Sequence, residues 1–130
     1  MTANKHTPGP WAFGKTCRDD QRLILGRGGK GKYICNVQIH QAPRSFGTHE
    51  EPEREANARL IAAAPELLEA CQTFSEWLCR EEAGFPAETR FDTPDGEAKW
   101  REWYYENLRI CDLAQTQARA AIAKATGGAA

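Results

Sequence analysis

Alternating apolar and polar residues mark the first third of the chain as a region of short strands. In the segment 32–40, one set of alternate residues is apolar and consists of Tyr33, Cys35, Val37 and Ile39. Such period-two alternation is typical of a strand buried on one face. The glycine-rich segment 26–31 suits a hairpin loop, because glycine adopts positive φ readily. The predicted elements are an extended lead-in over 1–10 and strands over 11–17, 21–25 and 32–40, which form an antiparallel meander over 11–40.

A helical pattern follows a loop over 41–53. Apolar residues recur at intervals of three and four in one stripe, formed by Leu60, Ala64, Leu67, Cys71, Phe74 and Leu78. This spacing places them on one face of a helix. Pro65 interrupts the helix, since proline removes a backbone hydrogen bond and pushes on the carbonyl of Ile61. The stripe keeps its phase across Pro65, so we predict a short helix over 54–63, a tight break, and a helix over 65–82 with Pro65 in its first turn.

The last third of the chain predicts one long helix after a loop over 83–96. Thr93 and Pro94 are the residue types preferred at an N-cap and at the first helical position. This helix is expected over 95–124, after the broken helix over 54–82, and the 130 residues are expected to form a single domain. The predicted fold is α+β: a small antiparallel β-meander packed on two long antiparallel helices, the first broken at Pro65. We expect the following contacts in its core: Tyr33, Cys35, Val37 and Ile39 against Leu60, Leu67, Cys71 and Phe74.

Charge divides the chain into two unlike halves. Residues 1–50 contain eight Lys and Arg against three Asp and Glu, a balance of +5, whereas residues 51–130 contain nine against fifteen, a balance of −6. The basic first half is therefore the expected side for an anionic partner. No apolar run approaches the roughly 18 residues of a membrane span, and the N-terminus lacks the apolar segment of a signal peptide. These features predict a cytoplasmic protein that does not insert into a membrane.

The cysteine and histidine residues give no sign of a metal centre or a catalytic nucleophile. The five cysteines are scattered without a C-x-x-C pair, which favours reduced, mostly buried thiols over a disulfide framework or a zinc site. The three histidines are also far apart in the sequence. We therefore expect no metal, no cofactor and no enzymatic activity.

Two motifs resemble those of a known family of small proteins. The chain carries "HTPGPW" at 6–11 and "EANARLIAAAPELLEA" at 55–70, separated by the strand-rich stretch. Together they resemble small bacteriophage and prophage proteins with an N-terminal TPGPW-like motif and an ANARLIAAAPELL-like helix. The resemblance implies a phage accessory protein. By analogy with other small phage proteins, it implies one that counters host defence.

A non-enzymatic binder of a small anionic nucleotide, which sequesters a signalling ligand, is the first functional hypothesis. Glycine-rich backbone and arginine side chains bind phosphates, and aromatic rings stack on bases. The candidate ligand-binding residues are Trp11, Arg18, Arg22, Arg27, Lys30, Tyr33, Asn57 and Arg59. Each has a plainer interpretation: the glycine loop as a solvated turn, Trp11 as a core residue, and Asn57 as a partner of nearby backbone.

The alternative hypothesis is a protein that inhibits a host defence or replication complex by surface occlusion, as anti-CRISPR proteins do. Its acidic helices would then imitate nucleic acid through Glu76, Glu81, Glu82, Glu97, Glu102 and Glu106. Under either hypothesis we expect a homodimer, or a multiple of one, because a small sheet covers only part of the apolar surface of two helices. The expected contacts are Trp103, Tyr104, Ala114, Ala118 and Ala121.

Overall fold

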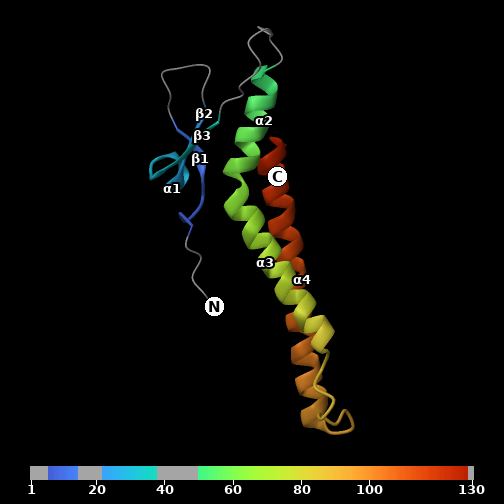
Figure 1. The fold of residues 1–130 in the computed structure, drawn as a ribbon. Coiled ribbons are helices and arrows are strands. Elements are labelled where there is room, and N and C mark those ends of the chain that lie inside the picture. The colour runs from blue at the N-terminus through green and yellow to red at the C-terminus, as the bar shows by residue number, and fades with distance from the viewer. Residues whose placement is uncertain (1–5, 15–21, 38–49, 129–130) are drawn as a thin grey trace.

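The computed structural model describes residues 6–14, 22–37 and 50–128, with the side chains of Arg22, Glu50 and Glu51 outside that description. Its elements are β1 (Ala12–Phe13), β2 (Arg22–Leu25), α1 (Gly26–Gly29), β3 (Tyr33–Val37), α2 (Glu50–Ala62), α3 (Ala64–Ala83) and α4 (Pro94–Thr126). A small sheet lies beside one end of a long helical hairpin, whose other half extends away from it (Figure 1). The predicted α+β class is confirmed.

The three strands form one antiparallel sheet in the order β1-β2-β3, as the alternation predicts. Ala12 pairs with Leu25 and Ile24 pairs with Cys35, with a shift in register between Ile24 and Leu25. The predicted strand residues 15–17, 21 and 38–40 lie outside the described residues. The hairpin loop is the short element α1, whose Arg27 and Gly28 have left-handed backbone angles, with φ of 50° and 63°.

The core of the sheet end forms against α2, and the predicted packing is wrong in most of its residues. Ile24 and Val37 are buried together with Ala58 and Ala62 of α2, while Trp11, Ile34, Cys35 and Ile61 pack around them. Tyr33, expected inside, is 62% exposed. Ile39 lies outside the described residues. The helix contributes small alanines because they let the sheet approach closely, whereas Leu60, Cys71 and Phe74 are exposed.

The broken helix has its discontinuity at the position that the sequence predicts. α2 ends at Ala62, and α3 begins at Ala64 with Pro65 in its first turn. The amide of Ala63 donates to the carbonyls of Arg59 and Leu60, and the carbonyl of Ala63 accepts from Leu67. Residues 50–53, expected in a loop, belong instead to α2, which begins at Glu50.

α3 and α4 pack along each other as an antiparallel pair (Figure 1). The buried residues of their contact are mostly small or polar: Ala63, Ala70, Asn107, Ile110, Ala114 and Ala121. Asn107 accepts a hydrogen bond from Arg80 Nε and donates one to Glu81 Oε1, both at 2.7 Å. This buried amide forms a polar clamp that fixes the register of the two helices.

The contact between α3 and α4 occupies residues that the sequence assigns to an interface between copies. Ala114 and Ala121 are almost fully buried within one chain. Trp103 packs its ring against Phe85 of the loop that joins the two helices. Ala114 and Ala121 are therefore unavailable for a contact between copies, and that part of the prediction is wrong, whereas Trp103 is only partly buried. Small residues face the neighbouring helix because alanine permits close approach of the two helix axes.

The ends of α4 carry the expected caps. Thr93 is the N-cap, and its Oγ1 accepts a hydrogen bond from the amide of Gly96 at 3.1 Å, with Pro94 in the first turn. At the other end, Gly127 adopts a left-handed conformation with φ of 72°. The helix begins and ends close to the predicted bounds of 95 and 124, and both caps follow the preferences of their residue types.

Candidate functional site

The segment His6–Trp11, here called the N-terminal strap, passes between the glycine loop and the start of α3. Gly9 lies so close to Pro65 that a Cβ atom built on it would be 2.8 Å from Pro65 Cβ. Lys124 Nζ, near the end of α4, donates to the carbonyl of Trp11 at 2.9 Å and contacts Glu66 Oε1 at 2.6 Å. The strap is thus held by α3 and α4 together, and the two sequence motifs meet at this point.

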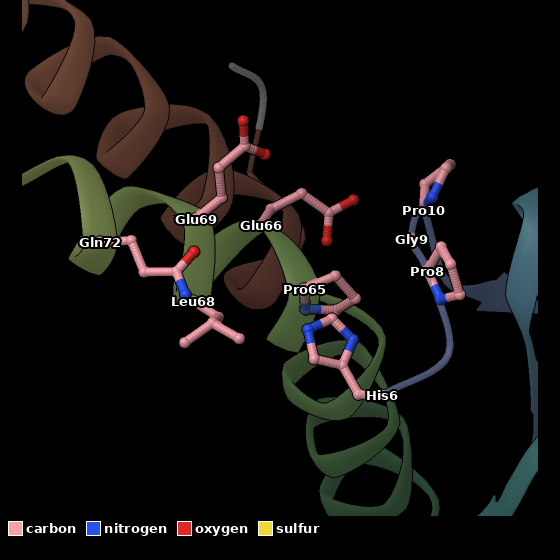
Figure 2. Close-up of a pocket in the computed structure, with 9 residues that line it drawn as sticks. All are labelled: His6, Pro8, Gly9, Pro10, Pro65, Glu66, Leu68, Glu69 and Gln72. Atoms are coloured by element: carbon pink, nitrogen blue, oxygen red, sulfur yellow. The ribbon is translucent and has the colours of Figure 1, made fainter. Parts of the chain in front are cut away.

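A cleft of about 480 Å³ separates the strap from α3 (Figure 2). Its strap side consists of His6, Pro8, Gly9 and Pro10, and its helix side of Pro65, Glu66, Leu68, Glu69 and Gln72. Glu69 gives the helix side a negative charge, to which Glu66 adds less because it is paired with Lys124. We call it the acidic cleft, and its charge disfavours an anionic ligand.

A second cleft, of about 590 Å³, lies on the other side of the strap. It is bordered by His6, Thr7, Pro8, Arg27, Gly31 and Lys32, and among these described residues none is acidic. Arg27 and Lys32 are both basic and exposed. We call it the basic cleft. His6 and Pro8 border both clefts, so the strap separates two sites of opposite charge.

The backbone of the glycine loop is largely occupied by its own hydrogen bonds. The amide of Gly26 donates to Lys32, that of Gly28 to Pro10, that of Lys30 to Arg27 and that of Gly31 to Gly26. These four N–H groups are therefore not directed at a ligand. Anion binding in the basic cleft would depend on side chains, chiefly the guanidinium of Arg27 and the ammonium of Lys32, rather than on a cradle of amides.

Four of the predicted ligand-binding residues lie near the basic cleft in different settings. Arg27 borders it directly. Lys30 is exposed on the same loop but is not among the residues that border the cleft. Tyr33 is exposed at the start of β3. Trp11 is half-buried against the sheet core, and its Nε1 donates to the carbonyl of Thr7 at 3.0 Å.

The remaining predicted residues are not gathered at this cleft. Asn57 is exposed on α2. Arg59 forms an ion pair with Glu55 at 3.4 Å and borders a separate cavity of about 280 Å³, which Trp11 and Gly127 also border. Arg22 belongs to β2, but its side chain lies outside the described residues, as does the whole of Arg18. The predicted set is therefore divided between two places on the sheet end.

His6 was not predicted as a ligand contact, and Lys32 was considered with the glycine loop but is absent from the list of candidate residues. Lys32 follows the glycine loop directly, so its charge and position are a signal that the sequence does provide. The position of His6 depends on the path of the strap, which Lys124 fixes from a point 113 residues away. The ring of His6 also lies edge-on to Trp11, with 6.5 Å between the ring centroids.

The described residues include no cluster of metal ligands, and the partly buried Cys35 thiol is a poor candidate for a nucleophile. Burial raises the pKa of the Cys35 thiol, which disfavours the nucleophilic thiolate. The prediction of mostly buried thiols is wrong for Cys71 and Cys79, which are exposed. Across the parts of the chain that the structure describes, no three His, Cys, Asp or Glu side chains gather as metal ligands would. None of the helices described has the length and apolar character of a membrane span.

Comparison with known proteins places the chain in a phage family. The sequence matches the family described as Salmonella phage P22 protein Y8K6 over residues 1–129. No curated protein and no solved structure matches it. Since the match covers almost the whole sequence, the chain belongs to the family of the Salmonella phage P22 protein Y8K6.

Proposed function

We propose that this phage protein is a non-enzymatic binder of a small anionic ligand of the nucleotide class, and that the basic cleft is its site. The observation that carries the proposal is the composition of that cleft. Its volume of about 590 Å³ falls within the range of small-molecule sites, about 300–1,000 Å³. Arg27 and Lys32 line it, and no acidic residue is found among its described neighbours.

The chemistry of the cleft suits a phosphate-bearing ligand. The guanidinium of Arg27 can donate two parallel hydrogen bonds to phosphate oxygens, and Lys32 adds a compact positive charge. His6 provides an aromatic ring at the edge, which suits the face of a base. By sequestering a nucleotide signal of the host, such a protein would counter host defence without catalysis.

The alternative of surface occlusion through an acidic, nucleic-acid-like face has weaker support. Several of its glutamates are paired with arginine: Glu97 with Arg101 at 2.7 Å, and Glu106 with Arg109 at 2.7 Å. The pKa of Glu106 is lowered by its hydrogen bond to Arg109. These pairs neutralise part of the negative face, which favours the anion-binding hypothesis over imitation of nucleic acid.

The proposal is tested by calorimetric titration and thermal shift with cyclic oligonucleotides and ADP-ribose derivatives. A ligand at 100 times its dissociation constant should add about 2.7 kcal/mol to the free energy of unfolding. Arg27→Ala or Lys32→Ala should each weaken binding at least tenfold, because a charge-assisted hydrogen bond is lost, worth about 1.5–3 kcal/mol.

Lys30→Ala is the matched control, because it removes the same charge from the same loop outside the cleft. It should change the dissociation constant by less than about threefold, the effect of a screened surface charge. Absence of binding by every ligand tested, or equal losses in the Lys30 and Lys32 variants, would refute the proposal for this cleft.

A further inference from the structure

The hairpin of α3 and α4 has an uncovered apolar face. The exposed large side chains on this face are Leu60, Phe74, Leu78, Tyr104, Leu108 and Ile122. They belong to two stripes with helical spacing, Leu60 to Leu78 on α2–α3 and Tyr104 to Ile122 on α4. We call the surface that these stripes form the apolar face.

Both stripes lie on the same side of the hairpin. In α3, Cys71 follows the buried seam residue Ala70 by one position, and in α4, Cys111 follows the buried seam residue Ile110 by one position. A residue one position after the seam lies about 100° around its helix. In an antiparallel pair, the second helix runs in the opposite direction, and its seam also faces the opposite way, toward the first helix. These two reversals cancel, so both residues point to the same side of the hairpin. The two stripes also lie at the same height along the hairpin, since Arg80 of α3 donates a hydrogen bond to Asn107 of α4.

The sheet lies on the opposite side and leaves this face free. It packs on α2 through Ala58 and Ala62, each two residues from Leu60 and so about 200° around the helix from it. Leu60 itself is 54% exposed. Among the described helices and strands, none lies beside the half of the hairpin that is distant from the sheet (Figure 1).

We infer that the apolar face is covered by the same face of a second copy of this chain, which forms a four-helix bundle. An interface of standard size takes about 800 Å² from each partner. The six large side chains expose roughly 550 Å², if a fully exposed one presents roughly 200 Å². The other stripe residues are partly or largely exposed and add to this area: Ala64, Leu67, Cys71, Cys111, Gln115 and Ala118.

The chemistry of the apolar face favours a second copy over other partners. Each of its twelve stripe residues is uncharged, so the face offers nothing to phosphates of nucleic acid or lipid. Its length of about 27 Å suits the flank of another helical hairpin. A two-fold dimer needs a surface that complements itself, and an identical uncharged face meets that requirement. This inference is independent of the proposed function, because the basic cleft lies at the sheet end.

The test is light scattering of the full chain at about 50 µM, with Leu108→Glu and a matched control. Leu108 lies on the apolar face, whereas Leu113 lies about 140° away on the other flank of the same helix. The two are 48% and 40% exposed, so the same substitution adds the same charge at similar cost to the protomer. We expect a dimer for the wild type and for Leu113→Glu, and a monomer for Leu108→Glu, with unchanged helical circular dichroism.

Two native cysteines provide a second measurement that needs no variant. Cys71 belongs to the apolar face, and Cys79 lies outside it on the same helix, and both are exposed in one protomer. Maleimide labelling of Cys71 should slow at least fivefold between about 1 µM and 100 µM protein, while that of Cys79 stays constant. The inference would be overturned by a monomeric wild type at 50 µM, or by dissociation of Leu113→Glu instead of Leu108→Glu. A labelling rate of Cys71 that is as independent of protein concentration as that of Cys79 would also overturn it. Capture of a different protein by a monomeric chain through this face would also overturn it.

Discussion

The sheet end and the helical hairpin both use alanine in their cores, but they place their large apolar side chains differently. At the sheet end, Ile24 and Val37 are buried against the alanines of α2. In the hairpin, alanines again fill the contact, yet large residues such as Phe74 and Leu108 are about half exposed. The sheet end therefore buries Ile24 and Val37 within one chain, whereas the hairpin leaves much of its large apolar surface exposed.

This difference also separates the two kinds of interaction that the protein offers. The sheet end carries the charged clefts on either side of the strap, which suit a small polar ligand. The apolar face of the hairpin is uncharged and extended, which suits another protein surface. If both proposals hold, assembly and ligand binding would vary independently.

The largest expected effect on stability comes from creating a cavity in the core of the sheet end or of the hairpin. Ile24→Ala and Ile110→Ala should each lower the free energy of unfolding by about 3 kcal/mol, because a buried side chain is replaced by a cavity. Leu113→Ala is the control on the exposed surface and should cost less than about 1 kcal/mol. The measurement is urea denaturation at a fixed protein concentration. A loss from Ile24→Ala as small as that of the control would mean that the sheet end contributes little to stability.

Removal of the polar clamp should give the next largest effect. Asn107→Ala leaves the facing groups of Arg80 and Glu81 without their partner and should destabilise the protein by about 2 kcal/mol. Asn57→Ala provides the matched control, since it makes the same change at an exposed helical position. Alanine has the better helix propensity, so the control should be neutral or slightly stabilising. Equal unfolding midpoints for the two variants would show that the clamp adds nothing.

A smaller effect is expected at the contact between the strap and α3. Gly9→Ala should cost about 1–2 kcal/mol, because its new Cβ atom meets Pro65 Cβ and the strap has to shift. Pro65→Ala alone should be tolerated within about 1 kcal/mol. It should not rescue Gly9→Ala, since alanine keeps the Cβ atom, whereas Pro65→Gly should.

Thermal unfolding of the single and double variants forms the corresponding mutant cycle. The coupling free energy between Gly9→Ala and the substitution of Pro65 should be near zero for Pro65→Ala and clearly favourable for Pro65→Gly. The same cost of Gly9→Ala in all three backgrounds would place the strain elsewhere on the strap.

The sequence predicts the elements of this fold better than it predicts their packing. Period-two alternation identifies the strands, and Thr93 and Pro94 locate the start of α4. The packing prediction fails because the stripe from Leu60 to Leu78 is the most hydrophobic one on its helix. The buried stripe includes Ala63 and Ala70, which have the same periodicity but smaller side chains. Hydrophobicity alone favours the larger residues, although alanine is what allows two helices to approach.

Only part of the candidate site follows from the sequence. The basic composition of the first half and the glycine loop indicate Arg27, and the same reasoning extends to Lys32. His6 joins the cleft because Lys124 and Glu66 hold the strap in place. Such contacts join residues that are distant in the sequence, so no local pattern predicts them.

The smallest effect should come from the N-cap of α4, and it tests whether the hairpin and the sheet end respond separately. Thr93→Ala removes the acceptor of the Gly96 amide and should cost about 1 kcal/mol. Thr93→Ser keeps the acceptor oxygen and should restore most of that loss. The cap lies at the end of the hairpin distant from the sheet (Figure 1). Amide hydrogen exchange should therefore accelerate in the first turns of α4 in Thr93→Ala and stay unchanged in β2 and β3, because fraying of a helix end is local. Equal acceleration in the strands would show that the two regions open as one cooperative unit.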